Sequence, residues 1–290
     1  MLGSALLQAL AARNQPTLQL VRRPAASPQQ VQWDPAAPRP VADLNALENL
    51  TAAVHFSGAN VAAHRWTPAY KREIGESRIQ STCALATTLA GLRNRPQLLL
   101  AASATGFYGN RGDQSLDESS SPGAGFLADL CVKWESAAQP AIDAGIRVVH
   151  LRFGVVLGPG PGALAKMLPI FRLGLGGPLG SGRQWMSWIS LQDAVAAILF
   201  LLQTLPVSGP VNLCAPNPVT NAEFTRALGR IVHRPAIFPA PAFALRLALG
   251  EMADEALLSS ARVYPAKLTS AGFRFTHPSI TQGLAAALTQ

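Results

Sequence analysis

The chain has 290 residues, 49% of them hydrophobic and only 14% charged, so it is long enough to bury a large core, in one main domain with a smaller appendage. Its formal net charge is +8, but the 24 basic residues are scattered, and no stripe of basic and aromatic residues argues for nucleic-acid binding. The three cysteines lie far apart without a CxxC or Cys/His cluster, which argues against a disulfide framework and a structural metal site.

No apolar run reaches the roughly 18 residues that a membrane-spanning helix needs, so we expect no membrane partner. The first residues, MLGSALLQALAARN, have no basic segment and no convincing cleavage site. Their leucines lie at helical spacing, and we expect a helix over residues 4–13 rather than a signal peptide. These features favour a location in the cytoplasm.

A strand is predicted over residues 17–23, directly after that helix. A strand so soon after a helix implies that another strand preceded the helix, so the chain is expected to begin inside a strand–glycine-turn–helix unit. Gly3 would be the last glycine of that turn, at a helix start where backbone N–H groups favour an anion. An ordinary N-terminal helix that caps the domain is the alternative.

Arg22 and Arg23 end the strand over residues 17–23, where the adenosine ribose of a dinucleotide would lie. An acidic residue there would accept hydrogen bonds from a ribose 2′-OH, whereas arginine pairs with a 2′-phosphate. The pair therefore favours NADP over NAD. A solvated basic turn is the alternative interpretation.

Three further segments have the unalternated apolar character of strands buried on both faces of a parallel sheet. They lie at residues 51–60, 98–109 and 147–158, and helices are predicted over 70–92 and 126–144. Ligands of such sheets bind beyond the carboxyl ends of the strands. The first strand ends in Ser57, Gly58 and Ala59, whose small side chains would let a cofactor approach the backbone, and the second ends in Ser103 and Thr105.

From residue 159 onward glycine and proline become frequent, so loops are expected to dominate and to build a substrate pocket. Helices are predicted over 191–203, over 221–232 with Asn221 as N-cap, and within 243–260. The expected division is a cofactor-binding domain over 1–158, a mixed substrate-loop region over 159–234 and a small C-terminal domain over 235–290.

The chain resembles the extended short-chain dehydrogenases/reductases, specifically the atypical branch known as NAD-dependent epimerase/dehydratase-like or cell-division-inhibitor-like. The resemblance spans nearly the whole chain. It rests on HFSGANVA at 55–62, SATGFYG at 103–109, FLADLCVKWE at 126–135 and LRFGVVLG at 151–158, and above all on FRLGLGGPLGSGRQ at 171–184. It implies an α/β fold: a Rossmann-type, doubly wound parallel sheet with NADP(H) across its carboxyl edge and a small C-terminal substrate domain.

The usual machinery of this superfamily is a Ser/Thr with a Tyr-x-x-x-Lys pair, in which the lysine and the cofactor ribose lower the pKa of the tyrosine so that the phenol can exchange a proton. With Glu135 as anchor, these positions fall on Leu127 and Cys131. Neither side chain can replace its counterpart, and Cys131 is expected in the core. This departure is itself characteristic of the branch.

The remaining candidates follow from the resemblance and from residue chemistry. The catalytic candidates are Ser103, Thr105, Tyr108 and Lys166, although packing is an equal alternative for Tyr108. The cofactor-binding candidates are Gly3, Arg22, Arg23, Ser57, Gly58, Ala59, Ser103, Arg152, Gly154 and Val155. The substrate-binding candidates are Arg65, Lys166, Arg183 and Trp188.

The sequence thus predicts an NADP(H)-binding oxidoreductase or epimerase that acts on a small polar substrate without the usual Tyr-Lys pair, as a monomer or homodimer. A non-catalytic NADP(H)-binding regulator or scaffold is the alternative, and the missing pair is the feature that favours it.

Overall fold

The computed structural model describes residues 1–204 and 206–288. The α-helices are α1 (Leu2–Ala11), α2 (Pro68–Ala90), α3 (Phe126–Ser136), α4 (Gln139–Asp143), α5 (Ala163–Arg172), α6 (Leu191–Gln203), α7 (Asn221–Ile231), α8 (Ala242–Leu249), α9 (Ala266–Ser270) and α10 (Ile280–Leu288). Short turns of other helix types are η1 (Asn45–Leu47), η2 (Thr105–Tyr108) and η3 (Ala253–Leu257). The strands are β1 (Gln19–Val21), β2 (Gln30–Gln32), β3 (Ala52–His55), β4 (Leu98–Ala104), β5 (Ser115–Leu116), β6 (Arg147–Phe153), β7 (Val155–Leu157), β8 (Trp185–Met186), β9 (Trp188–Ser190), β10 (Gly209–Leu213), β11 (Val219–Thr220) and β12 (Arg262–Val263).

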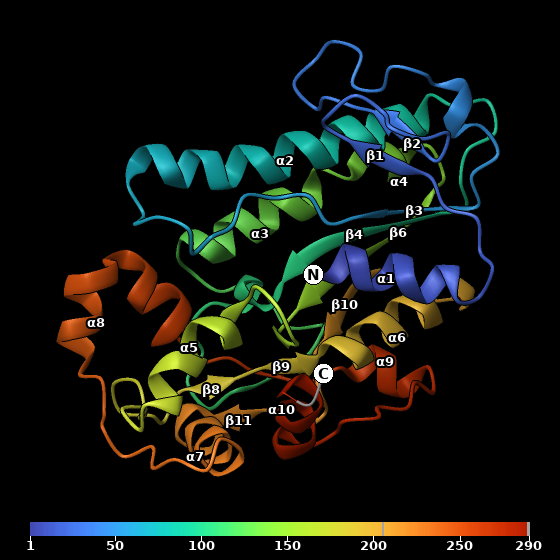
Figure 1. Cartoon of the computed structure of the whole chain (residues 1–290). Helices are drawn as coiled ribbons and strands as arrows, with labels where there is room; N and C mark the ends of the chain where they lie inside the picture. The colour runs from blue at the N-terminus through green and yellow to red at the C-terminus, as the bar shows by residue number, and fades with distance from the viewer. Residues whose placement is uncertain (205, 289–290) are drawn as a thin grey trace.

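The centre of the fold is a parallel sheet with the strand order β10–β6–β4–β3. Along β4, Leu98 and Leu100 pack on the side of α1 and α6, whereas Leu99 and Ala101 pack on the side of α2 and α4. Both faces of the strand are buried, as its unalternated apolar run predicts. The two helical layers lie above and below the sheet in Figure 1. The predicted Rossmann-like α/β fold is confirmed.

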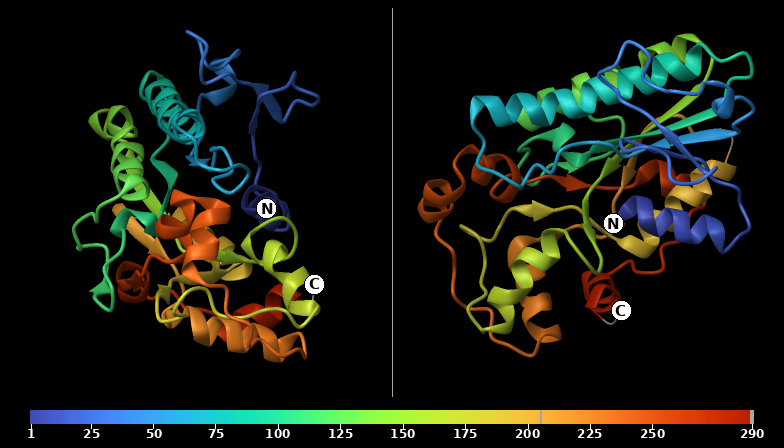
Figure 2. Two further views of the ribbon diagram at one scale, coloured as in Figure 1. Left: turned by 90° about the vertical axis from the view of Figure 1, so that its left-hand side faces the viewer. Right: turned by 45° about the horizontal axis from the view of Figure 1, so that its top comes forward.

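The β1–β2 pair stands apart from this sheet (Figure 2). It is held by Val31 and Trp33, which pack with Leu85 and Leu89 of α2. Among the described residues, β1 and β3 are not hydrogen-bonded to each other, and no other strand lies between them and pairs with both. Within the described residues the β1–β2 pair and the central sheet are therefore separate sheets.

Small two-stranded sheets, built mostly from the chain beyond β6, lie outside the central sheet, whereas β10 and α6 belong to the central sheet and the helical layer on it. The pairs are β7 with β9, β8 with β11, and β5 with β12. Trp188 of β9 is fully buried with Phe224 of α7 and Leu284 of α10, and joins these elements into one core.

The three-part division of the chain stays a prediction. None of the helices within residues 1–204 and 206–288 is long and apolar enough to cross a membrane.

Several helices differ from their predicted extents. The segment 126–144 forms two helices, because Pro140 in the first turn of α4 cannot continue the backbone ladder of α3. α5 lies in a region predicted as loop, since its burial of Leu164 and Phe171 outweighs the surrounding glycines and prolines. α7 is capped by Thr220 and not Asn221, through a capping box with Glu223.

Candidate functional site

The fold brings the predicted cofactor residues to one edge of the sheet. β3, β4 and β6 are parallel neighbours, so their carboxyl ends meet there. Ser57, Gly58 and Ala59 follow β3, Ser103 ends β4 and Gly154 follows β6. The sequence predicts this gathering correctly, because strand ends of a parallel sheet share an edge.

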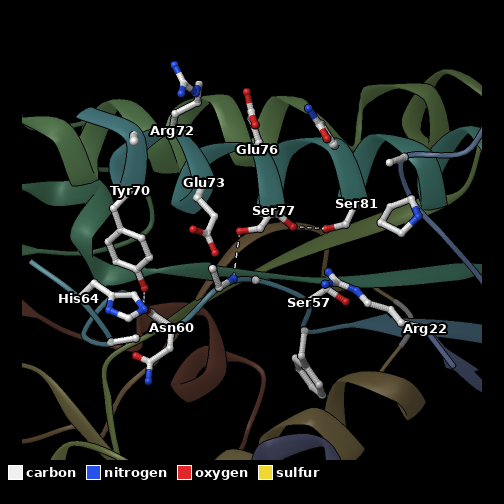
Figure 3. Close-up of a pocket in the computed structure, with 18 of the residues that line it drawn as sticks. Arg22, Ser57, Asn60, His64, Tyr70, Arg72, Glu73, Glu76, Ser77 and Ser81 are labelled. Carbon is white, nitrogen blue, oxygen red and sulfur yellow. Dashed lines mark hydrogen bonds between the residues drawn. The ribbon is translucent and has the colours of Figure 1, made fainter. Parts of the chain in front are cut away.

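A pocket of about 920 Å³ opens beside this edge. Its walls come from the end of β1 (Arg22), the loop after β2 (Asp34), the turn 56–60 after β3, and α2. In Figure 3, Tyr70, Glu73 and Ser77 point from α2 toward the turn, and Arg22 reaches in from β1.

Of the two arginines that end β1, only Arg22 lines this pocket. Arg23 is exposed, and its Nη1 donates to the carbonyl of Pro24 at 3.4 Å. The structure therefore separates the predicted pair: the pocket contains one of the two cations.

The turn after β3 is held in place by α2. The amide of Ala59 donates to Ser77 Oγ at 3.0 Å, as Figure 3 shows, and Arg78 Nη2 donates to the carbonyl of Ala59 at 2.9 Å. A Cβ on Gly58 would lie 3.0 Å from Arg78 Cζ. A side chain at Gly58 would therefore displace the guanidinium.

Gly3 lies in the first turn of α1, which packs on the sheet through Leu6. A Cβ on Gly3 would meet open space, so no neighbouring atom demands glycine at this position. The helix begins near Gly162, where a Cβ would lie 3.8 Å from Met1 Cε. The anion-binding role of Gly3 stays a prediction.

A buried polar network lies where the catalytic centre is predicted. Glu135 of α3 accepts hydrogen bonds from Ser103 Oγ at 2.7 Å and from Arg152 Nε and Nη2 at 2.7 and 2.8 Å. Arg152 Nη1 donates to the Tyr108 hydroxyl at 3.0 Å, and that hydroxyl donates to Asn212 Oδ1 at 2.7 Å. The guanidinium also lies 3.4 Å from the ring centroid of Phe107.

This network includes three of the predicted site residues, whose roles stay predictions. Tyr108 is fully buried, and burial raises the pKa of its phenol to about 12 although Arg152 opposes the shift. Ser103 and Arg152 are each 3% exposed, and their polar groups are taken up by Glu135. Buried polar groups that are fully paired in this way are suited to bracing the floor of a site.

The positions of the absent Tyr-Lys pair are apolar in space as well as in sequence. Leu127 packs against Gly106, where a Cβ would lie 3.3 Å from Leu127 Cβ. Cys131 is 2% exposed, and burial raises the pKa of its thiol to about 12, so it is a core residue as predicted. Lys133 of the same helix is exposed.

Thr105 is the predicted catalytic hydroxyl that keeps partial exposure, and its Oγ1 donates to the carbonyl of Phe153 at 3.3 Å. Gly154 and Val155 lie beside β9, with the Val155 amide bonded to the carbonyl of Ser187 at 2.8 Å. A Cβ on Gly154 would lie 2.6 Å from that oxygen, so this close approach requires glycine.

The predicted substrate residues are not brought together as a set. Lys166 of α5 is exposed, and its Nζ donates to the carbonyl of Ala62 at 2.5 Å, across from α5 to the segment after β3. Arg65 lies in that segment, with Nε 3.3 Å from a Cβ placed on Gly250. Arg183 is exposed on the loop after α5.

Trp188, the remaining predicted substrate residue, lies in the core. It is fully buried, and its Nε1 donates to the carbonyl of Asn217 at 3.1 Å. Alternation along the short strand β9 turns the ring into the core shared with α7 and α10, whereas substrate binding would need an accessible side chain, and the predicted role stays a prediction.

Sequence reasoning used Glu135 only as an alignment anchor and did not select Arg78 or Asn212. For Glu135 a signal existed: Arg152 lies within an apolar strand, and a buried arginine needs a carboxylate. Two other buried polar side chains have structural roles. His55 is a core residue bonded to Ser81 Oγ at 3.1 Å, and Asp193 braces a loop by accepting the amides of Thr276 and His277.

Comparison with known protein families matches most of the chain. Residues 1–214 match the model described as the NAD dependent epimerase/dehydratase family. Residues 240–287, which include α8 to α9 and most of α10, match a domain of unknown function, DUF1731.

Similar proteins cover the chain from end to end. The epimerase family protein Mb2239 of Mycobacterium bovis is 47% identical over 290 residues, which is 100% of this chain and 95% of that protein. The epimerase family protein SDR39U1 of Bos taurus is 36% identical, over 98% of this chain and 95% of that protein.

A crystal structure of the human epimerase family protein SDR39U1 (isoform 2) with NADPH has a TM-score of 0.90 at 32% identity. It covers 99% of this chain and 95% of that one. By family model, sequence identity and fold alike, the chain belongs to the NAD-dependent epimerase/dehydratase family.

Proposed function

We propose that this chain binds NADP(H) at the carboxyl edge of its sheet and catalyses a redox or epimerisation reaction on a small polar substrate. The observation that carries the proposal is the position of Arg22, whose guanidinium lines the same pocket as the turn 57–59. Arginine at the end of this strand suits a 2′-phosphate, whereas NAD-binding sites place a carboxylate there. The similar human protein was crystallised with NADPH.

The residues of the pocket fit such a cofactor. A volume of about 920 Å³ suits an adenosine with its phosphates, and Gly58 and Ala59 leave the backbone approachable. No carboxylate of the described residues forms a salt bridge with Arg22, so its charge is available to a phosphate. When bound, the cofactor would supply or accept a hydride.

The chain itself would handle the proton through groups that remain accessible. Thr105 Oγ1 at the end of β4 can turn from the carbonyl of Phe153 to a substrate oxygen. Lys166 Nζ can leave the carbonyl of Ala62 and donate a proton or bind an anionic substrate. Arg65 and Arg183 are exposed cations suited to substrate carboxylates or phosphates.

A non-catalytic NADP(H)-binding regulator is the second candidate. Leu127, Cys131 and the buried phenol of Tyr108 favour it, because none of them can exchange a proton with a substrate. A substrate whose addition oxidises NADPH in the presence of the protein would eliminate this candidate.

Titration of the protein with NADPH and with NADH tests the proposal. We expect clearly tighter binding of NADPH, followed by turnover of at least one compound in a screen of small polar carbonyls and alcohols. Binding of neither nucleotide would refute the proposed function, and binding without turnover would favour the regulator.

We also propose a monomer or homodimer in the cytoplasm, with small molecules and not nucleic acids or membranes as partners. The scattered arrangement of the basic residues supports this proposal. Salt-sensitive binding to DNA or RNA that NADPH does not displace would contradict it.

A further inference from the structure

Arg78 is a partly buried cation whose contacts within the described part of the fold do not neutralise its charge. It lies on α2, and burial lowers the pKa of its guanidinium. Among the described residues no carboxylate forms a salt bridge with it. Burial of an arginine without a counter-ion is costly, so such a group is retained where something compensates it.

The contacts that Arg78 makes leave much of the guanidinium unused. Nη1 donates to the carbonyl of Ile74 in its own helix at 3.0 Å, and Nη2 donates to the carbonyl of Ala59 at 2.9 Å. Its Cζ lies 5.1 Å from the ring centroid of Trp134 on α3. A guanidinium carries five N–H donors, and within the described part of the chain only these two nitrogens donate hydrogen bonds.

The position of the guanidinium relates it to the end of β3. It lies against Gly58, on the turn that also lines the pocket, and its guanidinium faces Trp134 of α3, the helix that also carries Cys131. Cys131 itself contacts the end of β4, with Sγ 3.7 Å from the carbonyl oxygen of Ala104. Arg78 therefore lies between the turn after β3 and helix α3, whose Cys131 contacts the end of β4.

Arg22 and Arg78 are two cations along this edge whose charge no carboxylate of the described residues neutralises, in contrast to Arg152, which pairs with Glu135. Arg22 follows β1, and Arg78 lies one step further, beyond β3. A dinucleotide crosses the strand ends of such a sheet, so a 2′-phosphate at Arg22 directs the other half of the molecule toward β3 and β4. That half carries a ribose with two hydroxyls and a phosphate, for which guanidinium N–H groups are suitable donors.

We propose that Arg78 is the positioning cation for the nicotinamide half of NADP(H), supplied from α2 because the lysine position on α3 is occupied by Cys131. The inference rests on the proposed function, since it assumes that the dinucleotide occupies this edge. Arg78 would orient the ribose through its unused N–H groups while its bond to Ala59 keeps the turn in place.

Two ligands separate this role from that of Arg22. NADPH contains both halves of the cofactor, whereas adenosine 2′,5′-bisphosphate contains the adenosine and the 2′-phosphate but lacks the nicotinamide half. We expect Arg78→Gln to weaken NADPH roughly tenfold or more, the loss of a charge-assisted hydrogen bond, and to leave the bisphosphate within about twofold of the unsubstituted chain. Arg22→Gln should weaken both ligands.

Two further variants serve as controls. Arg78→Lys retains the charge without the planar fork and should bind NADPH more tightly than Arg78→Gln. Lys133→Gln removes an exposed cation from α3 and should change neither affinity. Thermal unfolding of each variant shows whether it folds. If Arg78→Gln does not fold, Arg78→Lys is compared with the unsubstituted chain instead, and we expect it to lose affinity for NADPH but not for the bisphosphate.

An equal loss of NADPH and the bisphosphate in the Arg78 variants would overturn the proposal, because it would mean that Arg78 only shapes the turn. Unchanged NADPH affinity would overturn it as well. If the unsubstituted chain binds neither ligand, the proposed function fails together with this inference. If it binds both and Arg78 proves neutral, this inference alone fails.

Discussion

Arg152 of β6 and Glu135 of α3 form a two-pronged ion pair beneath the carboxyl edge of the sheet, with Nε and Nη2 lying 2.7 and 2.8 Å from the two carboxylate oxygens. The side chains are 4% and 12% exposed. Ser103 donates a hydrogen bond to Glu135, and the Tyr108 hydroxyl accepts one from Arg152. Two residues that resemble catalytic groups in the sequence therefore stabilise this ion pair.

Glu135→Gln should strongly destabilise the fold. Removal of one partner of a buried ion pair leaves the other charge uncompensated, which costs about 3–5 kcal/mol. The free energy of unfolding from urea titration measures the loss, and Lys133→Gln on the exposed side of α3 is the matched control. A loss below about 0.5 kcal/mol would show that the pair is dispensable.

Tyr108→Phe should lower stability without weakening cofactor binding. The variant leaves Asn212 Oδ1 without its donor and removes the acceptor of Arg152 Nη1, a cost of about 1–3 kcal/mol. Chemical unfolding and NADPH titration test the two parts separately. Loss of turnover in a stable variant with normal NADPH affinity would instead assign the phenol a catalytic role.

Arg22→Gln should weaken NADPH about ten- to a hundredfold and NADH far less, because a 2′-phosphate loses its charge-assisted partner whereas a 2′-hydroxyl loses little. Arg23→Gln is the neighbouring control, since Arg23 does not line the pocket. Equal losses for the two nucleotides in Arg22→Gln would contradict the 2′-phosphate assignment.

His55 should make the fold sensitive to mild acid. Burial lowers the pKa of its imidazole from 6.5 to about 4, so the unfolded chain takes up a proton that the folded chain resists. Stability is therefore full above about pH 6.5 and falls as the pH drops toward 4, by roughly 3 kcal/mol in total from this group.

The pH dependence of the unfolding free energy, measured between pH 4 and 8, tests the role of His55. His55→Asn should flatten this part of the curve even though it lowers stability overall. His233→Asn, which changes an exposed histidine, should leave the slope unchanged. A slope that persists in His55→Asn would assign the acid sensitivity to another group.

The cysteines should differ in reactivity. Cys83 is exposed on α2, whereas Cys131 and Cys214 are buried, and burial raises the pKa of both buried thiols. A thiol reagent should label one cysteine in the folded protein and three after denaturation, with mass spectrometry locating the labels. Rapid labelling of Cys131 in the native state would show that the floor of the site opens.

Much of this protein follows from sequence alone, because the deciding physics is local. The unalternated run Leu98–Ala102 predicts a strand buried on both faces, and the strand ends at Ser57 and Gly154 must then share one edge. The replacement of a Tyr-Lys pair by Leu127 and Cys131 is equally visible, since it depends only on the residue types at a fixed spacing.

Only the tertiary structure decided which polar side chains remain available for chemistry. Ser103, Tyr108 and Arg152 each resemble site residues in isolation, yet Glu135 and Asn212, distant in sequence, enclose them. Trp188 is likewise turned into a core formed by α7 and α10. Local pattern determines where a strand ends, whereas burial and ion pairing depend on which distant elements pack there. The surroundings of Arg78 are an example, because they depend on the packing of α2 against the turn after β3 and against α3.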